Sequence, residues 1–371
     1  MKKLKVIVVG AGRLGSFHAR KLATLDDVEL LAVVDPLPQS RDRLAAECRT
    51  WAVADWHSLP EPFDAAVIAA PTRWHHPLAM ELLDRGIHLL VEKPLCATLA
   101  EADELVNAAR RRGVIVQVGH VERFNPAFTA AAPHLQNPQY IEAVRTGSFT
   151  FRSIDIGVVL DLMIHDLDLI LALVPSRVRK VEAMGFSVLG GHEDVANARL
   201  QFECGCVAAL SASRVSHEAV RRMQVWSPRA FAGLDFAART TTLVCPSETL
   251  VHRQFDPQRL SPEQLDYYRE HFAAEHLPQQ RLEFEAVDAL ALELRDFIQS
   301  IRAGSSPQVT GAHGRNAVAL AERILAQIWA HTWAHPHDLP ASVPATGPHV
   351  VPAPHFGLAP AEAPALENQA G

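Results

Sequence analysis

Residues 5–15 read Lys-Val-Ile-Val-Val-Gly-Ala-Gly-Arg-Leu-Gly, an apolar run that leads directly into three glycines spaced as G-x-G-x-x-G. The run predicts a buried strand, and the residues after it have the periodicity of a helix. In such a unit Gly10 makes the tight turn, Gly12 lets the backbone approach a pyrophosphate, and Gly15 allows the helix to pack closely on the strand. The free amides at the start of the helix favour phosphate groups. The loop therefore predicts a dinucleotide site.

An aspartate at the end of the next predicted strand supports this site. Asp35 follows Val33 and Val34, twenty residues after the last glycine of the loop. A carboxylate there accepts hydrogen bonds from the adenosine ribose hydroxyls and repels a 2′-phosphate. This favours NAD as the cofactor, while the nearby Arg41 and Arg43 leave NADP open. The alternative is a glycine turn beside an ordinary surface aspartate.

Up to about residue 120, short apolar runs alternate with amphipathic stretches of helical length. The predicted strands are Lys5–Val9, Val28–Val34, Ala65–Ala69, His88–Val91 and Val114–Val118. The predicted helices are Leu14–Leu25, Gln39–Ala46, Pro77–Asp84 and Leu99–Arg112. Strands that alternate with helices imply βαβ crossovers, so we expect an α/β domain at residues 1–120 with a doubly wound parallel sheet.

After residue 120 the pattern changes to successive strands. These are Ile141–Arg152, Val178–Leu189, Val195–Glu203, Cys206–Val215, Met223–Trp226 and Thr240–Val244. The predicted helices of this part are Gly157–Val174, Leu282–Ile301 and Gly314–Ala330. We therefore expect a second, α+β domain at residues 121–333, with C-terminal helices and a large open sheet that is mainly antiparallel. Residues 334–371, rich in Pro and Ala, are predicted to be a disordered tail.

Composition excludes several other classes of protein. The chain has 371 residues, of which 48% are hydrophobic, which fits two globular domains. Its net charge of −7 argues against a nucleic-acid-binding protein. No apolar run is long enough for a membrane span. The five cysteines include no C-x-x-C pair, so we expect no structural metal site, and free thiols fit a cytoplasmic location.

A lysine follows the predicted strand at His88–Val91, in the sequence Glu92-Lys93-Pro94. A side chain at the carboxyl end of a parallel strand lies at the crevice where such sheets bind ligands. Lys93 can hydrogen-bond a substrate hydroxyl there and stabilise negative charge that develops on the oxygen. The alternative is a solvated surface lysine.

The predicted helix at Gly157–Val174 carries three ionisable residues among apolar neighbours. Asp161, His165 and Asp168 are spaced i, i+4, i+7, so they form one stripe on a regular helix. A carboxylate one turn from an imidazole sets its tautomer and raises its basicity, which suits proton abstraction from a hydroxyl. The stripe can instead face solvent, and a metal site from Asp161 and His165 is a further alternative.

Taken together, these segments resemble the glucose–fructose oxidoreductase/inositol dehydrogenase (Gfo/Idh/MocA) family. The similar segments are GAGRLGSFHA at 10–19, APTRWHHPLA at 70–79, GIHLLVEKPL at 86–95 and DLMIH at 161–165. The resemblance implies an N-terminal Rossmann domain and a C-terminal domain whose open sheet commonly forms the interface of a homodimer or homotetramer. It also implies an NAD(P)-dependent dehydrogenase that acts on CH–OH groups.

The resemblance implies a role for several residues. The catalytic residues are Lys93, which polarises the oxygen, His165, which takes the hydroxyl proton, and Asp161, which orients the imidazole. The candidate cofactor-binding residues are Gly10, Gly12, Arg13, Leu14, Gly15, Asp35, Pro71, Thr72, His75, Glu92 and Lys93. The candidate substrate-binding residues are Lys93, His120, Arg123, Arg152, Asp161 and His165.

The substrate implied is a small-molecule sugar, cyclitol or nucleotide sugar. The run DIGVVLDLMIHDLDLI at 155–170 is similar to the helix of UDP-N-acetylglucosamine 3-dehydrogenases, which make a 3-keto sugar for 3-amino sugars of lipid A or other envelope glycans. The alternatives are an inositol or free-sugar dehydrogenase, an NAD-dependent glycosidase of the same family, and a non-catalytic sensor of NAD and sugar.

Overall fold

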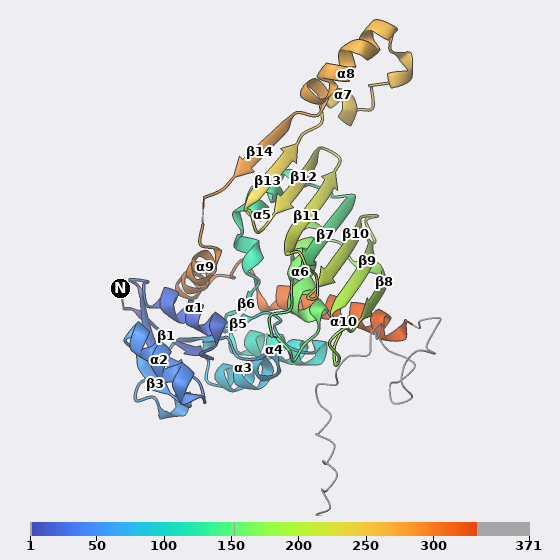
Figure 1. Ribbon diagram of the computed structural model, residues 1–371. Helices are drawn as coiled ribbons and strands as arrows, with labels where there is room; N and C mark the ends of the chain where they lie inside the picture. The colour runs from blue at the N-terminus through green and yellow to red at the C-terminus, as the bar shows by residue number, and fades with distance from the viewer. Residues whose placement is uncertain (1, 152, 286, 332–371) are drawn as a thin grey trace, which may run out of the picture.

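The first sheet is built from the strand–helix alternation in the N-terminal third of the chain. We analysed a computed structural model, which describes residues 2–151, 153–285 and 287–331; Arg152 and the predicted tail at 334–371 lie outside this part. All six strands are parallel, in the order β3-β2-β1-β4-β5-β6 (Figure 1). They are β1 (Leu4–Val9), β2 (Val28–Val34), β3 (Trp51–Val53), β4 (Ala65–Ile68), β5 (His88–Glu92) and β6 (Val116–Gly119).

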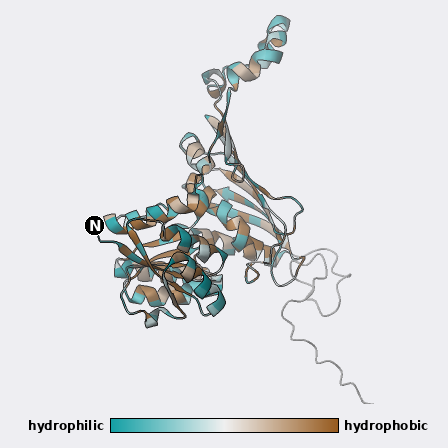
Figure 2. Ribbon diagram, turned by 60° about the vertical axis from the view of Figure 1, so that its left-hand side comes forward, coloured by the Kyte–Doolittle hydropathy of each residue, from teal (hydrophilic) through white to brown (hydrophobic). Residues whose placement is uncertain are grey.

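Both faces of this sheet are buried, as expected for near-continuous apolar strands. Along β1, Ile7 and Val9 belong to one hydrophobic cluster, and Val6 and Val8 belong to another. Figure 2 shows these strands as brown, hydrophobic ribbons between helices. The helices that follow the strands are α1 (Arg13–Leu22), α2 (Pro38–Cys48), α3 (His75–Asp84) and α4 (Leu99–Arg112). The sequence did not predict β3, a short strand at the edge of the sheet with Trp51 exposed.

The second sheet has eight strands in the order β14-β13-β12-β11-β7-β10-β9-β8, and β7 and β10 are its parallel neighbours. The strands are β7 (Tyr140–Thr146), β8 (Val178–Phe186), β9 (Val195–Phe202), β10 (Val207–Ser213), β11 (Val220–Ser227), β12 (Ala230–Asp235), β13 (Thr240–Val244) and β14 (Gln279–Glu283). Buried and more exposed residues alternate along β9 and β10, so one face of the sheet is buried and the other is open. The expected fold class, a doubly wound parallel sheet followed by a large, mainly antiparallel sheet, is confirmed.

The helix predicted over Gly157–Val174 is not regular. It begins with a π-helical turn, η5 (Val159–Met163), and continues as α6 (Ile164–Leu173). A π turn closes i→i+5 hydrogen bonds, so residues four apart across it no longer lie directly above one another. The regular stripe predicted for this helix therefore does not form.

The helix predicted over Leu282–Ile301 was wrong in its first part. Leu282 lies in β14, which pairs with β13, and the helix α9 (Ala289–Ala303) begins several residues later. Pairing with a neighbouring strand has overridden the local helical pattern. Helix α9 then returns to the first sheet, where Leu294, Phe297 and Ile298 are buried in the same cluster as Val6.

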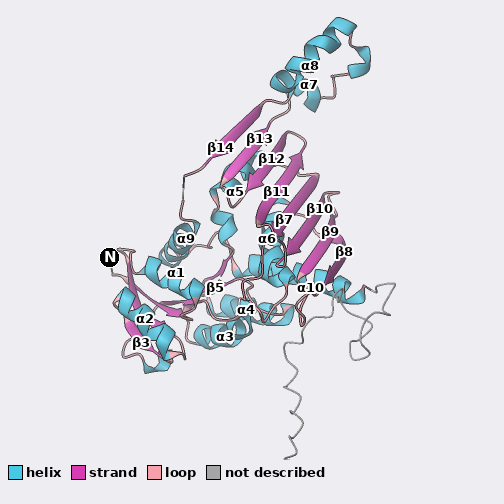
Figure 3. Ribbon diagram, in the orientation of Figure 1, coloured by secondary structure: helices cyan, strands magenta, loops and turns pink. Residues whose placement is uncertain are grey.

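The chain makes an excursion between β13 and β14. Helices α7 (Glu248–Val251) and α8 (Pro262–His276) lie beyond the end of these strands and project from the body of the molecule (Figures 1 and 3). The long helix α10 (Gly311–Ala330) packs against α6, α4 and β8, so it contacts both domains. The sites described below lie where these two domains meet.

Candidate functional site

The glycine loop has the shape that a dinucleotide requires. A side chain at Gly10 would place its Cβ 2.5 Å from the carbonyl oxygen of Ala69, and one at Gly15 would reach 1.8 Å from the oxygen of Gly10. Gly10 also has a φ of 105°, which favours glycine. A Cβ at Gly12 would instead meet nothing within 4 Å. Two glycines thus permit close packing, and the third leaves an open approach beside the first amides of α1.

Asp35 is held beside this loop at the end of β2. Its carboxylate accepts hydrogen bonds from the backbone N–H of Ala11 at 2.7 Å and of Leu37 at 2.8 Å. Arg41 lies close by, with a guanidinium N–H donated to the backbone oxygen of Asp35 at 2.9 Å. Arg43 is exposed. The loop and the carboxylate therefore fit the pyrophosphate and the ribose of NAD.

Lys93 lies directly after β5, and Asp161 lies in η5 of the second domain. The Lys93 Nζ donates hydrogen bonds to the backbone oxygen of Asp161 at 2.7 Å and to its carboxylate at 3.0 Å. Both side chains are mostly buried, with 13% and 19% of their surfaces exposed. The contact joins the two domains at the carboxyl edge of the first sheet, as the sequence predicted for Lys93.

His165 lines the same cavity, of about 460 Å³, as Lys93 and Asp161. Its Nδ1 is shielded from solvent and has no hydrogen-bond partner among the described residues. The expectation that Asp161 orients this imidazole is not met, because the carboxylate bonds to Lys93 instead. Burial, and then the charges of Lys93 and Arg145, hold the pKa of His165 well below its usual value. The imidazole is therefore neutral at neutral pH, and its basicity is lowered rather than raised.

His120 lies against His165 with its ring edge on, at 6.4 Å between the ring centroids. It is buried, and neither ring nitrogen has a partner in the described part of the chain. Burial lowers the pKa of its imidazole. The structure thus brings His120 next to the candidate site, where it packs behind His165.

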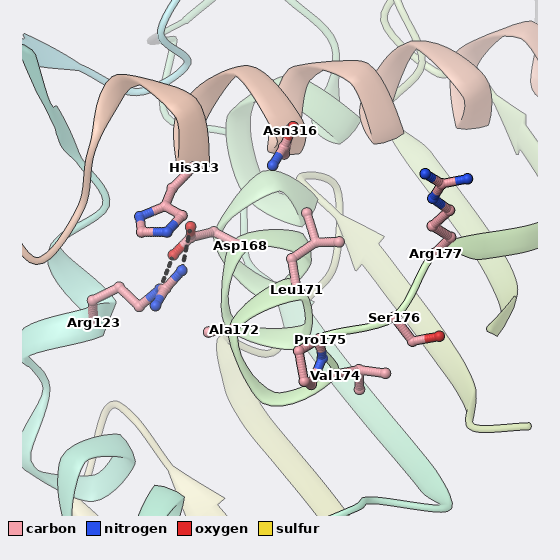
Figure 4. Close-up of a pocket in the computed structure, with 10 residues that line it drawn as sticks. All are labelled: Arg123, Asp168, Leu171, Ala172, Val174, Pro175, Ser176, Arg177, His313 and Asn316. Carbon is pink, nitrogen blue, oxygen red and sulfur yellow. Dashed lines mark hydrogen bonds and ion pairs between the residues drawn. The ribbon is translucent and has the colours of Figure 1, made fainter. Parts of the chain in front are cut away.

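Arg123 and Asp168 lie elsewhere. The Arg123 guanidinium donates two hydrogen bonds to the Asp168 carboxylate, at 2.6 and 3.1 Å. Figure 4 shows this pair facing His313. The three residues line a separate cavity of about 530 Å³, and neither Lys93 nor His165 lines it. The interpretation of Arg123 as a substrate-binding residue is therefore not supported, because its charge is already neutralised by a buried carboxylate.

The segment after β4 contacts the chain that follows Lys93 and supports it. Pro71 precedes the short helix η2 (Thr72–Trp74), and Thr72 is buried there. His75, at the start of α3, is buried with its two ring nitrogens 2.8 Å from the backbone oxygens of Pro94 and Ala70. It joins this segment to the chain that follows Lys93 and does not line the 460 Å³ cavity. Arg13 and Leu14 start α1, and Leu14 does line the cavity.

Glu92 belongs to a buried cluster that sequence reasoning missed. Its carboxylate lies 2.7 Å from Nε2 of His18, on α1, and accepts a hydrogen bond from the backbone N–H of Lys93 at 3.2 Å. Burial opposes ionisation of Glu92, but the contact with His18 and the charge of Lys93 lower its pKa. The carboxyl of Glu293, on α9, is also buried and has no hydrogen-bond partner among the described residues. Burial, and then the charge of Glu92, raise the pKa of Glu293 well above its usual value.

One donor atom from each of His18, Glu92 and Glu293 lies within 4.8 Å of the others, so these groups are close enough to hold a cation. The contact between Nε2 of His18 and the Glu92 carboxylate already has hydrogen-bond length, so these two atoms need no cation between them. Their positions 18, 92 and 293 give no local sequence signal. Only the return of α9 to the first sheet brings the third residue close.

Three arginines also line the 460 Å³ cavity and were not predicted: Arg145, Arg214 and Arg221. Alternation along a strand did not separate them from ordinary surface arginines, because the acids that pair with Arg145 and Arg214 come from other segments. None of the helices that the structure describes is long and apolar enough to cross a membrane.

Comparison with known proteins agrees with this geometry. Residues 4–120 match the NAD-binding Rossmann fold of the Gfo/Idh/MocA oxidoreductase family, and residues 119–230 match the C-terminal domain of that family. The chain is 32% identical to a UDP-N-acetylglucosamine 3-dehydrogenase of Acidithiobacillus ferrooxidans, over 87% of this chain and 97% of that protein. It is 29% identical to a scyllo-inositol 2-dehydrogenase (NAD(+)) of Bacillus subtilis, over 58% of this chain and 68% of that protein.

Solved structures show the same fold. The UDP-N-acetylglucosamine 3-dehydrogenase of Acidithiobacillus ferrooxidans superposes with a TM-score of 0.76 at 31% identity, over 89% of this chain and 99% of that one. Levoglucosan dehydrogenase in complex with NADH superposes with a TM-score of 0.74 at 16% identity, over 88% and 97% of the two chains. The resemblance stated from the sequence is confirmed: this chain belongs to the Gfo/Idh/MocA family of oxidoreductases and is a dehydrogenase with an NAD-binding Rossmann domain.

Proposed function

We propose that this dehydrogenase oxidises a secondary hydroxyl of a nucleotide sugar to a ketone, at C3 of UDP-N-acetylglucosamine. The observation that carries the proposal is the meeting of Lys93, Asp161 and His165 in one cavity, which Leu14 of the glycine loop also lines. A proton acceptor and an ammonium group thus lie beside the coenzyme domain, as oxidation of an alcohol requires.

Lys93 and Asp161 act together on the substrate oxygen. An ammonium group has three N–H donors, and two of them bond to the carboxylate and the backbone oxygen of Asp161. The third remains for the hydroxyl of the sugar. Held in this way, Lys93 stabilises the negative charge that develops on oxygen, and Asp161 is the positioning residue that fixes its direction.

His165 takes the hydroxyl proton. Its lowered pKa keeps the imidazole neutral, with a lone pair free to accept a proton at neutral pH. As the O–H bond breaks, its electron pair forms the C=O bond and the hydride leaves the same carbon. His120 packs against the base from behind and is the candidate to fix the direction of its ring.

Bound NAD supplies the hydride acceptor. Gly10, Gly12 and Gly15, with the first amides of α1, would hold the pyrophosphate, and Asp35 would bind the ribose hydroxyls. Glu92 lines the cavity behind Lys93 and fixes the backbone of the lysine.

The choice of substrate is supported by the similarity to a UDP-N-acetylglucosamine 3-dehydrogenase, at 32% identity over 87% of this chain and 97% of that protein. The test is NADH absorbance with a panel of UDP-N-acetylglucosamine, free N-acetylglucosamine and myo-inositol. We expect turnover of the UDP-sugar and a 3-keto product. Turnover of inositol alone would instead support the second candidate, an inositol dehydrogenase like the relatives of that name. Sugar release without net NADH would indicate a glycosidase.

The open face of the eight-stranded sheet is the proposed contact between subunits of a homodimer or homotetramer. It carries the more exposed residues of alternating strands, among them Met184, of which 38% is exposed. Sedimentation analysis tests this assembly. The five cysteines are free, which supports a cytoplasmic location.

A further inference from the structure

Three arginines lie side by side at the ends of neighbouring strands. Arg145 on β7 pairs directly with Arg221 on β11. Ser213, the last residue of β10, pairs with Thr146, so Arg214 follows next to these two strands. Directly paired residues leave the same face of a sheet, and all three arginines line the cavity that holds Lys93 and His165.

The positive charges of two of these arginines are neutralised by carboxylates of the protein itself. Arg145 is buried and donates hydrogen bonds to Glu122 at 2.9 Å and to Asp166 at 2.8 Å. Arg214 is buried and bonds to Asp194 at 2.6 Å. Their charges therefore belong to the structure of the second domain.

The third arginine differs. Arg221 is exposed at the cavity, and its guanidinium makes neither a hydrogen bond nor an ion pair with a residue that the structure describes. It stands directly opposite Arg145, and like charges in this position are unfavourable. Its neighbour Arg222 points to the other face of the sheet and pairs with Asp235 at 3.0 Å. The cavity thus contains one cation without an internal counterion.

Among the described residues that line the cavity, no carboxylate is free to compensate Arg221. Both carboxylates that line the cavity, Glu92 and Asp161, are in contact with Lys93. Thr146, at the end of β7, and residues 147–150 of the following loop also line the cavity, and none of them is acidic. The charge of Arg221 also reaches His165, since it is among the charges that lower the pKa of that imidazole. An anionic ligand would relieve both effects.

We propose that Arg221 binds the phosphate groups of the substrate, and that it selects a nucleotide sugar over a neutral sugar or cyclitol. The proposal rests on the proposed function, for which it names the residue that recognises the anion. A guanidinium fork pairs with two phosphate oxygens at once, and a diphosphate supplies the counter-charge that Arg221 lacks. Neutral substrates leave Arg221 uncompensated.

The test compares Arg221→Gln with the matched control Arg222→Gln, which removes the same charge from the opposite face. With NAD saturating, KM and kcat are measured for UDP-N-acetylglucosamine, N-acetylglucosamine 1-phosphate and N-acetylglucosamine. We expect R221Q to raise KM for the UDP-sugar by about 10- to 100-fold, the loss of one charge-assisted contact, with kcat little changed. KM for N-acetylglucosamine should not change, and R222Q should behave as wild type.

The monophosphate separates recognition of a phosphate from recognition of the nucleotide. If R221Q raises KM for the 1-phosphate as well, Arg221 contacts the phosphate next to the sugar, and if only the UDP-sugar is affected, it contacts the second phosphate. Loss of the positive charge should also move the acid limb of kcat/KM to higher pH, because the pKa of His165 rises. A KM for the UDP-sugar that is equal in R221Q and wild type overturns the proposal.

Calorimetric titration of the NAD-loaded protein with UDP keeps this inference separate from the proposed activity. Suppose that the wild type does not oxidise UDP-N-acetylglucosamine but binds UDP more tightly than R221Q does. This result would refute the proposed substrate and support the anion site. Oxidation of the UDP-sugar with unchanged UDP affinity in R221Q would refute the anion site alone. If R221Q does not fold, Arg221→Lys replaces it as the test variant, because lysine keeps the charge but lacks the guanidinium fork. A KM for the UDP-sugar equal to that of the wild type would then contradict the proposal.

Discussion

Two charged regions lie on either side of the Glu92–Lys93 peptide, and they are built by opposite rules. Behind it, His18, Glu92 and Glu293 form an acidic cluster that is almost fully buried. In front of it, Lys93 and the arginines line an open cavity. In the first region burial, and then the charge of Glu92, raise the pKa of the Glu293 carboxyl and so favour its uncharged form. In the second, one cation keeps its charge exposed.

The difference shows how the same kind of residue serves structure or recognition. A charge that the fold needs is paired or neutralised inside, as Glu293, Arg145 and Arg214 are. A charge intended for a ligand is left accessible and without an internal partner. The changes below test this distinction, from the largest expected effect to the smallest.

Removal of the Lys93 ammonium group should have the largest effect on turnover. Lys93→Ala should lower kcat by about 10²- to 10⁴-fold, because the charge on the substrate oxygen loses its ammonium partner. Binding of NAD, followed by fluorescence titration, should remain close to wild type. Turnover within a few-fold of wild type would exclude Lys93 from the reaction.

Loss of the proposed base should be nearly as large. His165→Asn should lower kcat by about 10²-fold or more, because no other imidazole is found among the described residues that line the cavity. The matched control is His76→Asn, which changes a histidine of α3 that contacts Glu104 outside the cavity. Equal kcat values for the two variants would remove His165 from the mechanism.

The pH dependence of wild-type activity measures how far burial and the positive charges at the cavity lower the pKa of His165. Because burial and the charge of Lys93 lower the pKa of His165, the acid limb of kcat/KM should lie below pH 6.5, the usual value for histidine. Activity is retained on the alkaline side of that limb, where the imidazole is neutral. A limb above pH 6.5 would contradict the assignment of the base.

Glu293→Gln should change the pH dependence of stability and leave the activity unchanged. The raised pKa means that the folded protein holds this proton to higher pH than the unfolded chain does. Its contribution is therefore complete below about pH 4.5 and is lost as pH rises toward the folded-state pKa. Because glutamine stays neutral, E293Q should exceed wild type in stability by about 1–3 kcal/mol at pH 8, and the difference should disappear near pH 4.5. Denaturant unfolding at both pH values measures this, and a difference independent of pH would refute it.

Local sequence was enough for five of the six parallel strands, the glycine loop and the position of Lys93. These follow from apolar runs and from motifs confined to about ten residues. It was not enough for the partner of Asp161, because the π turn at η5 changes which side chains face one another. Arg123 shows the same limit: its partner Asp168 lies 45 residues away and cannot be read from either segment alone.

Charge balance was the least predictable property of the site. Arg145, Arg214 and Arg221 have the same side chain, and their different roles depend on acids from other elements. A signal was nevertheless present, since β7 and β11 each place an arginine next to the end of the strand where the site lies. This signal can be interpreted only once the strand register is known to align Arg145 with Arg221.

The return of α9 to the first sheet has a consequence for synthesis of the chain on the ribosome. When residue 120 emerges, all six strands of the first sheet are available, but Leu294, Phe297 and Ile298, which fill one face of its core, are still to be translated. The nascent N-terminal third therefore carries an apolar face that α1 and α2 cover only in part until α9 has been made. Such an intermediate is a natural client for a chaperone, and a gene fragment that stops near residue 120 should yield an aggregating product.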